Sequence, residues 1–175
     1  MRIFIGHDSR YKDATKVCKQ SILNHWPEAD ITYLDKAALI KAGIYGRKDV
    51  EGESTEFSFT RFLVPYLNNY QGWAIFCDCD MVFLVDADEI FRQANDKYAV
   101  MCAKHDYTPP EGEKMDGQLQ LQYPRKNWSS MMLFNAHKCK ALSIDYVNRA
   151  SGLDLHRFNW LEDDDEIGEI PQKWN

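Results

Sequence analysis

The sequence has no long hydrophobic run and no excess of basic residues. No apolar stretch approaches the roughly 20 residues that a membrane-spanning helix needs. The strand-like residues Ile3-Phe4-Ile5 follow Met1 almost at once, without the apolar region of a signal peptide. We therefore expect a cytoplasmic protein. The formal net charge of -6 argues against general binding of nucleic acid, because proteins that do so present a basic face.

Cysteine is scarce and shows no disulfide pattern. The five cysteines are odd in number and lie in apolar stretches, unlike the paired framework of a small secreted protein. Cys77 and Cys79 form a Cys-x-Cys pair that could bind a soft metal. No second pair of Cys or His residues follows at the spacing of a zinc site. We expect these thiols to be buried.

Strand-like and helical patterns alternate along the chain. A length of 175 residues with 45% hydrophobic content suits one core, so we expect a single domain over residues 1–175. An α/β fold with a mostly parallel, Rossmann-like sheet follows from the alternation. The pattern predicts strands at 3–6, 31–34, 73–77, 81–85, 98–103 and 131–134, and helices at 13–26, 36–42, 55–64, 87–94 and 143–150.

Three polar segments lack a clear period. We expect 44–53 to be a surface loop, and the acidic run 162–166 to be a solvated loop. The stretch 108–127 is long for irregular chain in a compact domain, which favours a binding loop or lid.

Two carboxylates, Asp78 and Asp80, stand at the end of the apolar run that begins at Trp73. In an extended chain residues i and i+2 share a face, so the two side chains converge. Like charges in partly apolar surroundings need a proton, a basic partner or a cation. Oxygen ligands favour Mg²⁺ or Mn²⁺, and such an ion also binds the phosphates of a diphosphate.

An apolar strand ending in Asp-x-Asp occurs in nucleotide-sugar glycosyltransferases and in haloacid-dehalogenase-type phosphohydrolases. The fragment Asp78-Cys-Asp-Met-Val82 fits both. The phosphohydrolase motif normally lies on the first strand of its fold, whereas two predicted strands precede Asp78 here. A phosphohydrolase with Asp78 as nucleophile stays an alternative.

Six segments in order carry a wider resemblance: IFIGHDSR, STEFSFTRFLVPYL, GWAIFCDCDMVFL, KHDYTP, YPRKNWSSMMLFN and IGEIPQKWN. The chain resembles GT-A-fold glycosyltransferases, and among them the group related to glycosyltransferase family 8, in a short form found in phage and bacterial genomes. The resemblance implies transfer of a sugar from a nucleoside-diphosphate donor, with UDP as the nucleotide, to a hydroxyl acceptor with retention of configuration.

The resemblance also implies roles for single residues. Asp78 and Asp80 would hold Mn²⁺ or Mg²⁺ against the donor diphosphate, and Arg61 would contact the donor. Alternatively, Arg61 forms an ion pair with Glu56 or lies at the surface. The residues implied to border the nucleotide are Gly6, His7, Asp8 and Arg10; for Gly6 an ordinary strand-end turn is equally open.

Two segments depart from the family pattern. Trp128 and Ser130 replace residues that are often Asn and Gly, and with Ser129 they could contact the donor sugar, although Trp128 could also belong to the core. His156 and Arg157 stand where many family 8 enzymes have Asp-Gln-Asp. They could supply catalytic contacts to the acceptor or phosphate, or be structural.

Related enzymes continue beyond the Trp174-Asn175 step with a segment that holds a histidine ligand. We expect that this C-terminal segment is lacking here, which would weaken metal binding. A catalytically inactive domain that binds nucleotide-sugar is therefore a further alternative.

Overall fold

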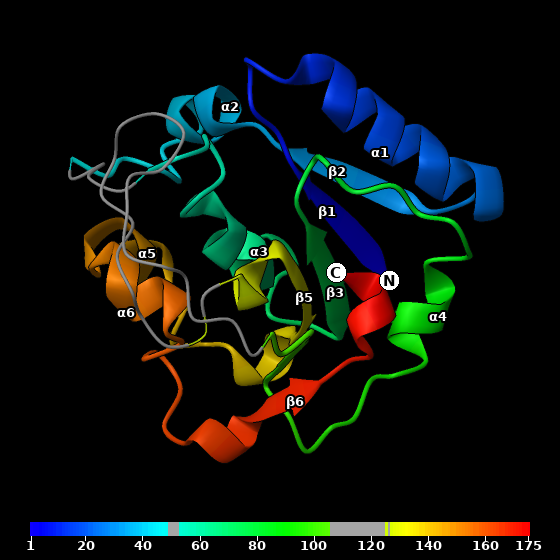
Figure 1. The fold of residues 1–175 in the computed structure, drawn as a ribbon. Helices are drawn as coiled ribbons and strands as arrows, with labels where there is room; N and C mark the ends of the chain where they lie inside the picture. Colours follow the sequence, from blue (N-terminus) through cyan, green and yellow to red (C-terminus); the bar gives the residue numbers. More distant parts are fainter. Residues whose placement is uncertain (49–52, 106–124, 126) are drawn as a thin grey trace, which may run out of the picture.

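The computed structural model describes residues 1–48, 53–105, 125 and 127–175, which build a six-stranded sheet with helices on both sides (Figure 1). The strands are β1 (Arg2–Gly6), β2 (Asp30–Leu34), β3 (Trp73–Cys77), β4 (Val100–Cys102), β5 (Met131–Asn135) and β6 (Ile167–Glu169). The helices are α1 (Lys12–His25), α2 (Lys36–Lys41), α3 (Val64–Leu67), α4 (Asp88–Phe91), α5 (Ile144–Arg149) and α6 (Gly152–His156).

The strand order β2-β1-β3-β5-β4-β6 confirms the predicted α/β fold with a mostly parallel sheet. Strand β1 pairs in parallel with β2 and β3, and β4 with β6, whereas β5 is antiparallel to both of its neighbours. Five strands therefore point in one direction. Their carboxyl ends and the start of β5 share one edge of the sheet, which we call the carboxyl edge. In open α/β sheets this is where ligands bind.

The central strands form the middle of the core. Residues 74–77 of β3 and all of β5 are buried, because these strands are covered on both faces and read as continuous apolar runs. Helix α1 lies against β1 and β2, while α5 and α6 lie on the opposite side of the picture, beyond α3 (Figure 1). Helix α1 ends at His25, shortly before Pro27, and the Asp35 side chain caps α2 by accepting from the N–H of Ala38.

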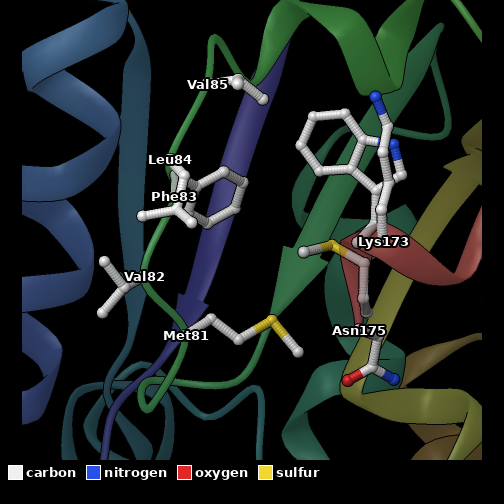
Figure 2. A pocket seen from close by; sticks show the side chains of 9 residues that line it. Met81, Val82, Phe83, Leu84, Val85, Lys173 and Asn175 are labelled. Atoms are coloured by element: carbon white, nitrogen blue, oxygen red, sulfur yellow. The ribbon is translucent and has the colours of Figure 1, made fainter.

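Two predicted elements are wrong. Residues 81–85 form no strand and run as irregular chain (Figure 2), because β1 is already paired on both sides and offers no free edge. Residues 55–64 form no single helix. Turns lead into the 3-10 turn η1 (Thr60–Leu63) and then α3, and Pro65 lies in the first turn of α3 instead of ending a helix.

The remaining polar segments are only partly described. The predicted lid at 108–127 lies outside the described residues except for Arg125 and Asn127, and 49–52 of the predicted surface loop also lie outside them. The acidic run contains a short exposed 3-10 turn, η4 (Asp164–Glu166), which leads into β6. In the described part of the chain no helix is both long and apolar enough to cross a membrane.

Candidate active site at the carboxyl edge of the sheet

The ends of β1 and β3 lie side by side, as the sequence predicts. Ile5 of β1 is in register with Cys77 of β3, and Asp78 follows directly. The backbone N–H of Asp78 donates to the carbonyl of Ser130 at 2.9 Å. Ser130 ends the 3-10 turn η2 (Trp128–Ser130), which leads into β5. Three segments that are distant in sequence therefore meet around Asp78.

Arg61 is the charged partner of Asp78. Its side chain is almost fully buried, and its Nη1 lies 3.0 Å from Oδ1 of Asp78. The same nitrogen donates to the carbonyl of Ser129 at 2.7 Å, and Nε donates to the carbonyl of Phe57 at 3.2 Å. Both alternatives considered for Arg61, a surface position and a pair with Glu56, are wrong; Glu56 accepts from Ser9 instead. A donor contact by Arg61 stays a prediction.

Asp78 is poorly satisfied despite this ion pair. The approach of Arg61 to Oδ1 is not aligned for a hydrogen bond, and the buried Oδ1 has no hydrogen-bond donor among the described residues. Burial, the largest cause, and the charge of Asp80 raise the pKa of Asp78 to about 6, although the charge of Arg61 lowers it. An additional positive charge at this carboxylate would favour its ionised form.

Asp80, the second acid of the pair, has an exposed side chain. Cys79, between the two acids, is buried. All five cysteines are free and buried, which the sequence predicted for most of them, and Sγ of Cys77 lies 3.9 Å from Sγ of Cys18. In the part of the chain that the structure describes, no group of three His, Cys, Asp or Glu residues could hold a metal ion. Two carboxylates offer hard oxygen ligands that suit Mg²⁺ or Mn²⁺ when ligand oxygens and water complete the shell, and metal binding stays a prediction.

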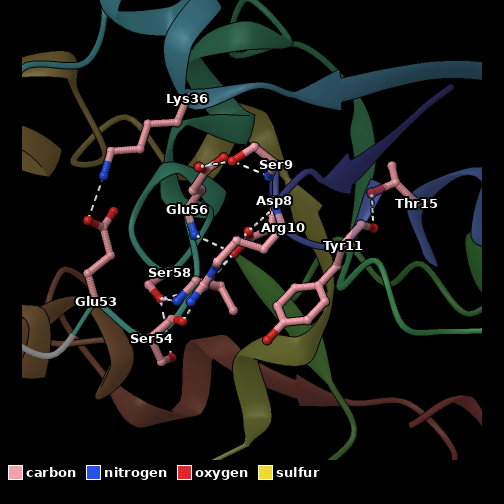
Figure 3. A network of polar contacts seen from close by, with 11 residues as sticks. Asp8, Ser9, Arg10, Tyr11, Thr15, Lys36, Glu53, Ser54, Glu56 and Ser58 are labelled. Carbon is pink, nitrogen blue, oxygen red and sulfur yellow. Dashed lines mark hydrogen bonds and ion pairs between the residues drawn. The ribbon is translucent and has the colours of Figure 1, made fainter. Parts of the chain in front are cut away.

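Asp8 forms a second, fully satisfied centre at the end of β1 (Figure 3). Its Oδ1 accepts from the backbone N–H and from Nε of Arg10, both at 2.9 Å, and its Oδ2 accepts from Nη2 of Arg10 at 2.7 Å and from the N–H of Glu56 at 3.1 Å. The Arg10 guanidinium and these N–H groups lower the pKa of Asp8 to about 2. Asp8 and Arg10 thereby fasten the end of β1 to the segment at 54–56.

Gly6 and His7 also have protein contacts. A Cβ on Gly6 would lie 2.5 Å from Cγ of Phe57, so packing alone requires glycine there. His7 stacks on Tyr33 with a centroid distance of 5.9 Å, and its Nδ1 lies 3.2 Å from Oγ1 of Thr15. Neither contact excludes a nucleotide nearby, and the predicted nucleotide contacts of both residues stay predictions.

The turn η2 connects the site to α6. Oγ of Ser129 lies 2.9 Å from Nδ1 of His156, whose ring packs edge-on against Phe62 with a centroid distance of 5.2 Å. The hydroxyl of Ser130 donates to the carbonyl of Asn127 at 3.1 Å. Half-buried Trp128 donates from Nε1 to the carbonyl of His105 at 3.0 Å. His156 therefore reaches Asp78 through Ser129 and Arg61.

His156 is the last residue of α6, and Arg157 is its C-cap residue. Nε of Arg157 is buried and has no hydrogen-bond partner in the described part of the chain, and its carbonyl accepts from Arg125. A catalytic role for the two residues stays a prediction.

Tyr11 is a candidate that the sequence reading missed. The residues from Ser9 to Ala14 line an open hollow of about 400 Å³ just beyond β1. The ring of Tyr11 is exposed, and the guanidinium carbon of Arg10 lies 5.3 Å from its centroid. An exposed aromatic ring beside a polar turn suits a stacked base. The signal was an aromatic residue directly after the polar run His7 to Arg10.

The fold has known counterparts, although no family model matches the chain. The chain is similar to the bifunctional glycosyltransferase WbbM (TM-score 0.67, 14% identity, 100% of this chain and 39% of WbbM). It is also similar to the glycosyltransferase GlyE of Streptococcus pneumoniae (TM-score 0.62, 13% identity, 99% and 46%) and to mouse xyloside xylosyltransferase 1 (TM-score 0.58, 12% identity, 99% and 86%). The chain spans less than half of WbbM and of GlyE.

These likenesses define the class: the chain has the fold of GT-A glycosyltransferases. At the sequence level it is 52% identical over 177 residues to Protein CDI of Arabidopsis thaliana, an alignment that covers 99% of this chain and 68% of the plant protein. The chain belongs to the family of Protein CDI. The resemblance to glycosyltransferase family 8 in particular stays a prediction.

Proposed function

We propose that the protein is a metal-dependent glycosyltransferase that moves a sugar from a nucleoside diphosphate, UDP, to a hydroxyl acceptor with retention of configuration. The observation that carries this proposal is the position of Asp78 and Asp80. They follow a central strand at the carboxyl edge of a GT-A-like sheet, and the buried Oδ1 of Asp78 has no hydrogen-bond donor in the described residues. The glycosyltransferases of the same fold support the class of reaction.

Asp78 and Asp80 would hold Mn²⁺ or Mg²⁺, since their carboxylates offer hard oxygen ligands, and diphosphate oxygens and water would supply the remaining ligands. Bound there, the ion would offset the negative charge that develops on the leaving nucleoside diphosphate.

Arg61, Ser129 and His156 act as positioning residues in this proposal. Arg61 fixes the Asp78 carboxylate, and its guanidinium is held by the carbonyls of Ser129 and Phe57. Nη1 of Arg61 lies 3.4 Å from Oγ of Ser129, so the hydroxyl can accept from Arg61 while it donates to Nδ1 of His156. This arrangement requires the neutral tautomer of His156 with its proton on Nε2.

The nucleotide would lie along the end of β1. Tyr11 would stack on the base, and the turn from His7 to Arg10, held by Asp8, would border the ribose and diphosphate. Trp128, Ser129 and Ser130 face the same edge and would border the donor sugar.

Calorimetric titration of UDP with and without Mn²⁺ tests the proposal. We expect binding that EDTA abolishes and that weakens about tenfold or more in Asp80→Asn, because one ionic ligand is lost. Asp80 is exposed, so this variant should fold normally. The matched control is Asp145→Asn, an exposed carboxylate on α5, which should bind like the wild type.

Two outcomes would reject the proposal: no binding of UDP or another nucleoside diphosphate in Mn²⁺, or equal binding by Asp80→Asn. Transfer to an acceptor separates an enzyme from an inactive binding domain. Release of phosphate from simple esters, together with a beryllium fluoride adduct on Asp78, would favour the phosphohydrolase alternative.

A further inference from the structure

A groove of about 470 Å³ begins beside the candidate active site, within the range of about 300–1,000 Å³ typical of small-molecule sites. Met81, which lines it, follows Asp80, and Met131 in its wall follows Ser130. Figure 2 shows Met81 and Asn175 at the end where β1 and β3 finish, and Val85 at the opposite end. The groove therefore extends from the carboxyl edge back along the sheet.

One wall of the groove exposes apolar side chains. Leu84 is 79% exposed, Val82 56% and Val85 40%. Among the described residues only eight large hydrophobic side chains are exposed, and these three fall within four consecutive positions. Single exposed apolar residues are ordinary, whereas a cluster that lines a groove marks a binding surface.

The opposite wall carries polar groups. Trp174 is 9% exposed, and the buried Nε1 of its ring has no acceptor in the described part of the chain. The ammonium of Lys173, 3.5 Å from Glu89, and the amide of Asn175 lie on the same wall. A ligand that fits both walls has an apolar body and oxygen acceptors.

We propose that this groove binds the apolar aglycone of the sugar acceptor. The acceptor would be one amphiphilic molecule, a hydroxyl-bearing head group on an alkyl or lipid chain. Its head would lie near Asp80, its chain would contact Val82 and Leu84, and its oxygens would accept from the ammonium of Lys173. The inference rests on the proposed function, because it names the acceptor class of the same site.

The probe for this groove is n-octyl β-D-glucoside at concentrations below micelle formation, with glucose as the comparison. We expect the octyl compound to bind about tenfold or more tightly than glucose, because the chain leaves water. Leu84→Asp should weaken its binding about tenfold or more. Leu84 is largely exposed, so the variant should fold.

The matched control is Ile40→Asp, which changes an apolar side chain of similar exposure to Val82, 51%, on α2. It should bind the octyl compound like the wild type. Equal binding of glucose and octyl glucoside, no binding of either, or unchanged binding by Leu84→Asp would overturn the inference.

Two other occupants give different results. If a second copy covers the groove, sedimentation should show a dimer that Leu84→Asp dissociates, without binding of monomeric octyl glucoside. If a membrane surface covers the groove, the protein should bind phosphatidylcholine vesicles and should not bind monomeric octyl glucoside. Either result overturns the proposal.

Titration of UDP with Mn²⁺ separates this inference from the proposed function. Leu84→Asp should leave UDP binding unchanged. Binding of UDP without binding of octyl glucoside refutes the acceptor groove alone. Binding of octyl glucoside without UDP refutes the transferase and leaves an amphiphile site.

Discussion

Two carboxylates, Asp8 and Asp78, follow neighbouring parallel strands, and each faces an arginine, yet their environments are opposite. Four hydrogen bonds reach Asp8, and its pKa falls to about 2. Asp78 has an ion pair with Arg61 but no aligned donor on its buried Oδ1, and its pKa rises to about 6. Arg10 bonds both oxygens of Asp8 and lowers its pKa, whereas at Asp78 burial outweighs the lowering of the pKa by Arg61. Asp8 therefore holds the end of β1, and Asp78 is the acid for which we propose a cation.

Phe57 connects these two carboxylates. Its ring occupies the space above Gly6, and its carbonyl accepts from Nε of Arg61. The guanidinium carbon of Arg61 also lies 5.3 Å from the centroid of that ring. The end of β1 is thus packed against the residue that places the counter-charge of Asp78.

Replacing each acid by its amide should give the largest contrast. Asp8→Asn should lower the free energy of unfolding by about 3 kcal/mol, because the amide turns its NH₂ toward donors of Arg10 or Glu56. Asp78→Asn should change it by less than about 1 kcal/mol, because a costly buried charge disappears and Arg61 keeps the carbonyls of Ser129 and Phe57. Urea unfolding in EDTA measures both; equal losses would contradict the contrast.

The sequence predicted the strands that matter for the site, because an apolar run followed directly by an acid is a local signal. It therefore placed Asp78 at the end of β3. It could not predict which acid is satisfied, since the partners are distant: Arg61 bonds Ser129 from 68 positions away, and Ser129 bonds His156 from 27.

Contacts between segments that are distant in sequence also explain the elements that the sequence predicted wrongly. Residues 81–85 are apolar enough for a strand, but no strand edge is free beside β1. Strand β6 is only three residues long, too short for a period, and forms because β4 offers it an edge.

Gly6→Ala tests the packing between the two carboxylates. The new Cβ would lie 2.5 Å from the Phe57 ring, so the ring must move, and we expect a loss of about 2 kcal/mol of unfolding free energy. Gly46→Ala is the control, since no atom of the described residues lies within 4 Å of its Cβ position and it should cost less than about 0.5 kcal/mol.

A second substitution, made in the Gly6→Ala variant, identifies why that variant loses stability. Adding Phe57→Leu should recover part of the stability if the clash with the ring is responsible. Unchanged stability with weaker UDP binding would instead show that Gly6 is required by the nucleotide, as the sequence reading had it.

The smallest expected effect is the change in unfolding free energy with pH. Its sign should differ between the two acids, so it compares them most directly. The folded pKa of Asp78, about 6, lies above its reference value of 3.8, so protonation of Asp78 favours the folded state. The stabilisation of the folded state by protonated Asp78 is absent above about pH 6 and complete below about pH 4. The folded pKa of Asp8, about 2, lies below 3.8, so its stabilisation is complete above about pH 4 and is lost as the pH falls toward 2.

Unfolding free energies of the wild type and the two amide variants, measured in EDTA at about pH 7, 4 and 2, separate the two acids. The wild type should gain about 1–2 kcal/mol relative to Asp78→Asn between pH 7 and 4. It should lose about 1–2 kcal/mol relative to Asp8→Asn between pH 4 and 2, a range that allows for the half-exposed side chain of Arg10. If the two differences in unfolding free energy change in the same direction with pH, the fold treats the two carboxylates alike. The pKa contrast between Asp8 and Asp78 is then wrong. Opposite signs would confirm that the fold favours the ionised form of Asp8 and the protonated form of Asp78.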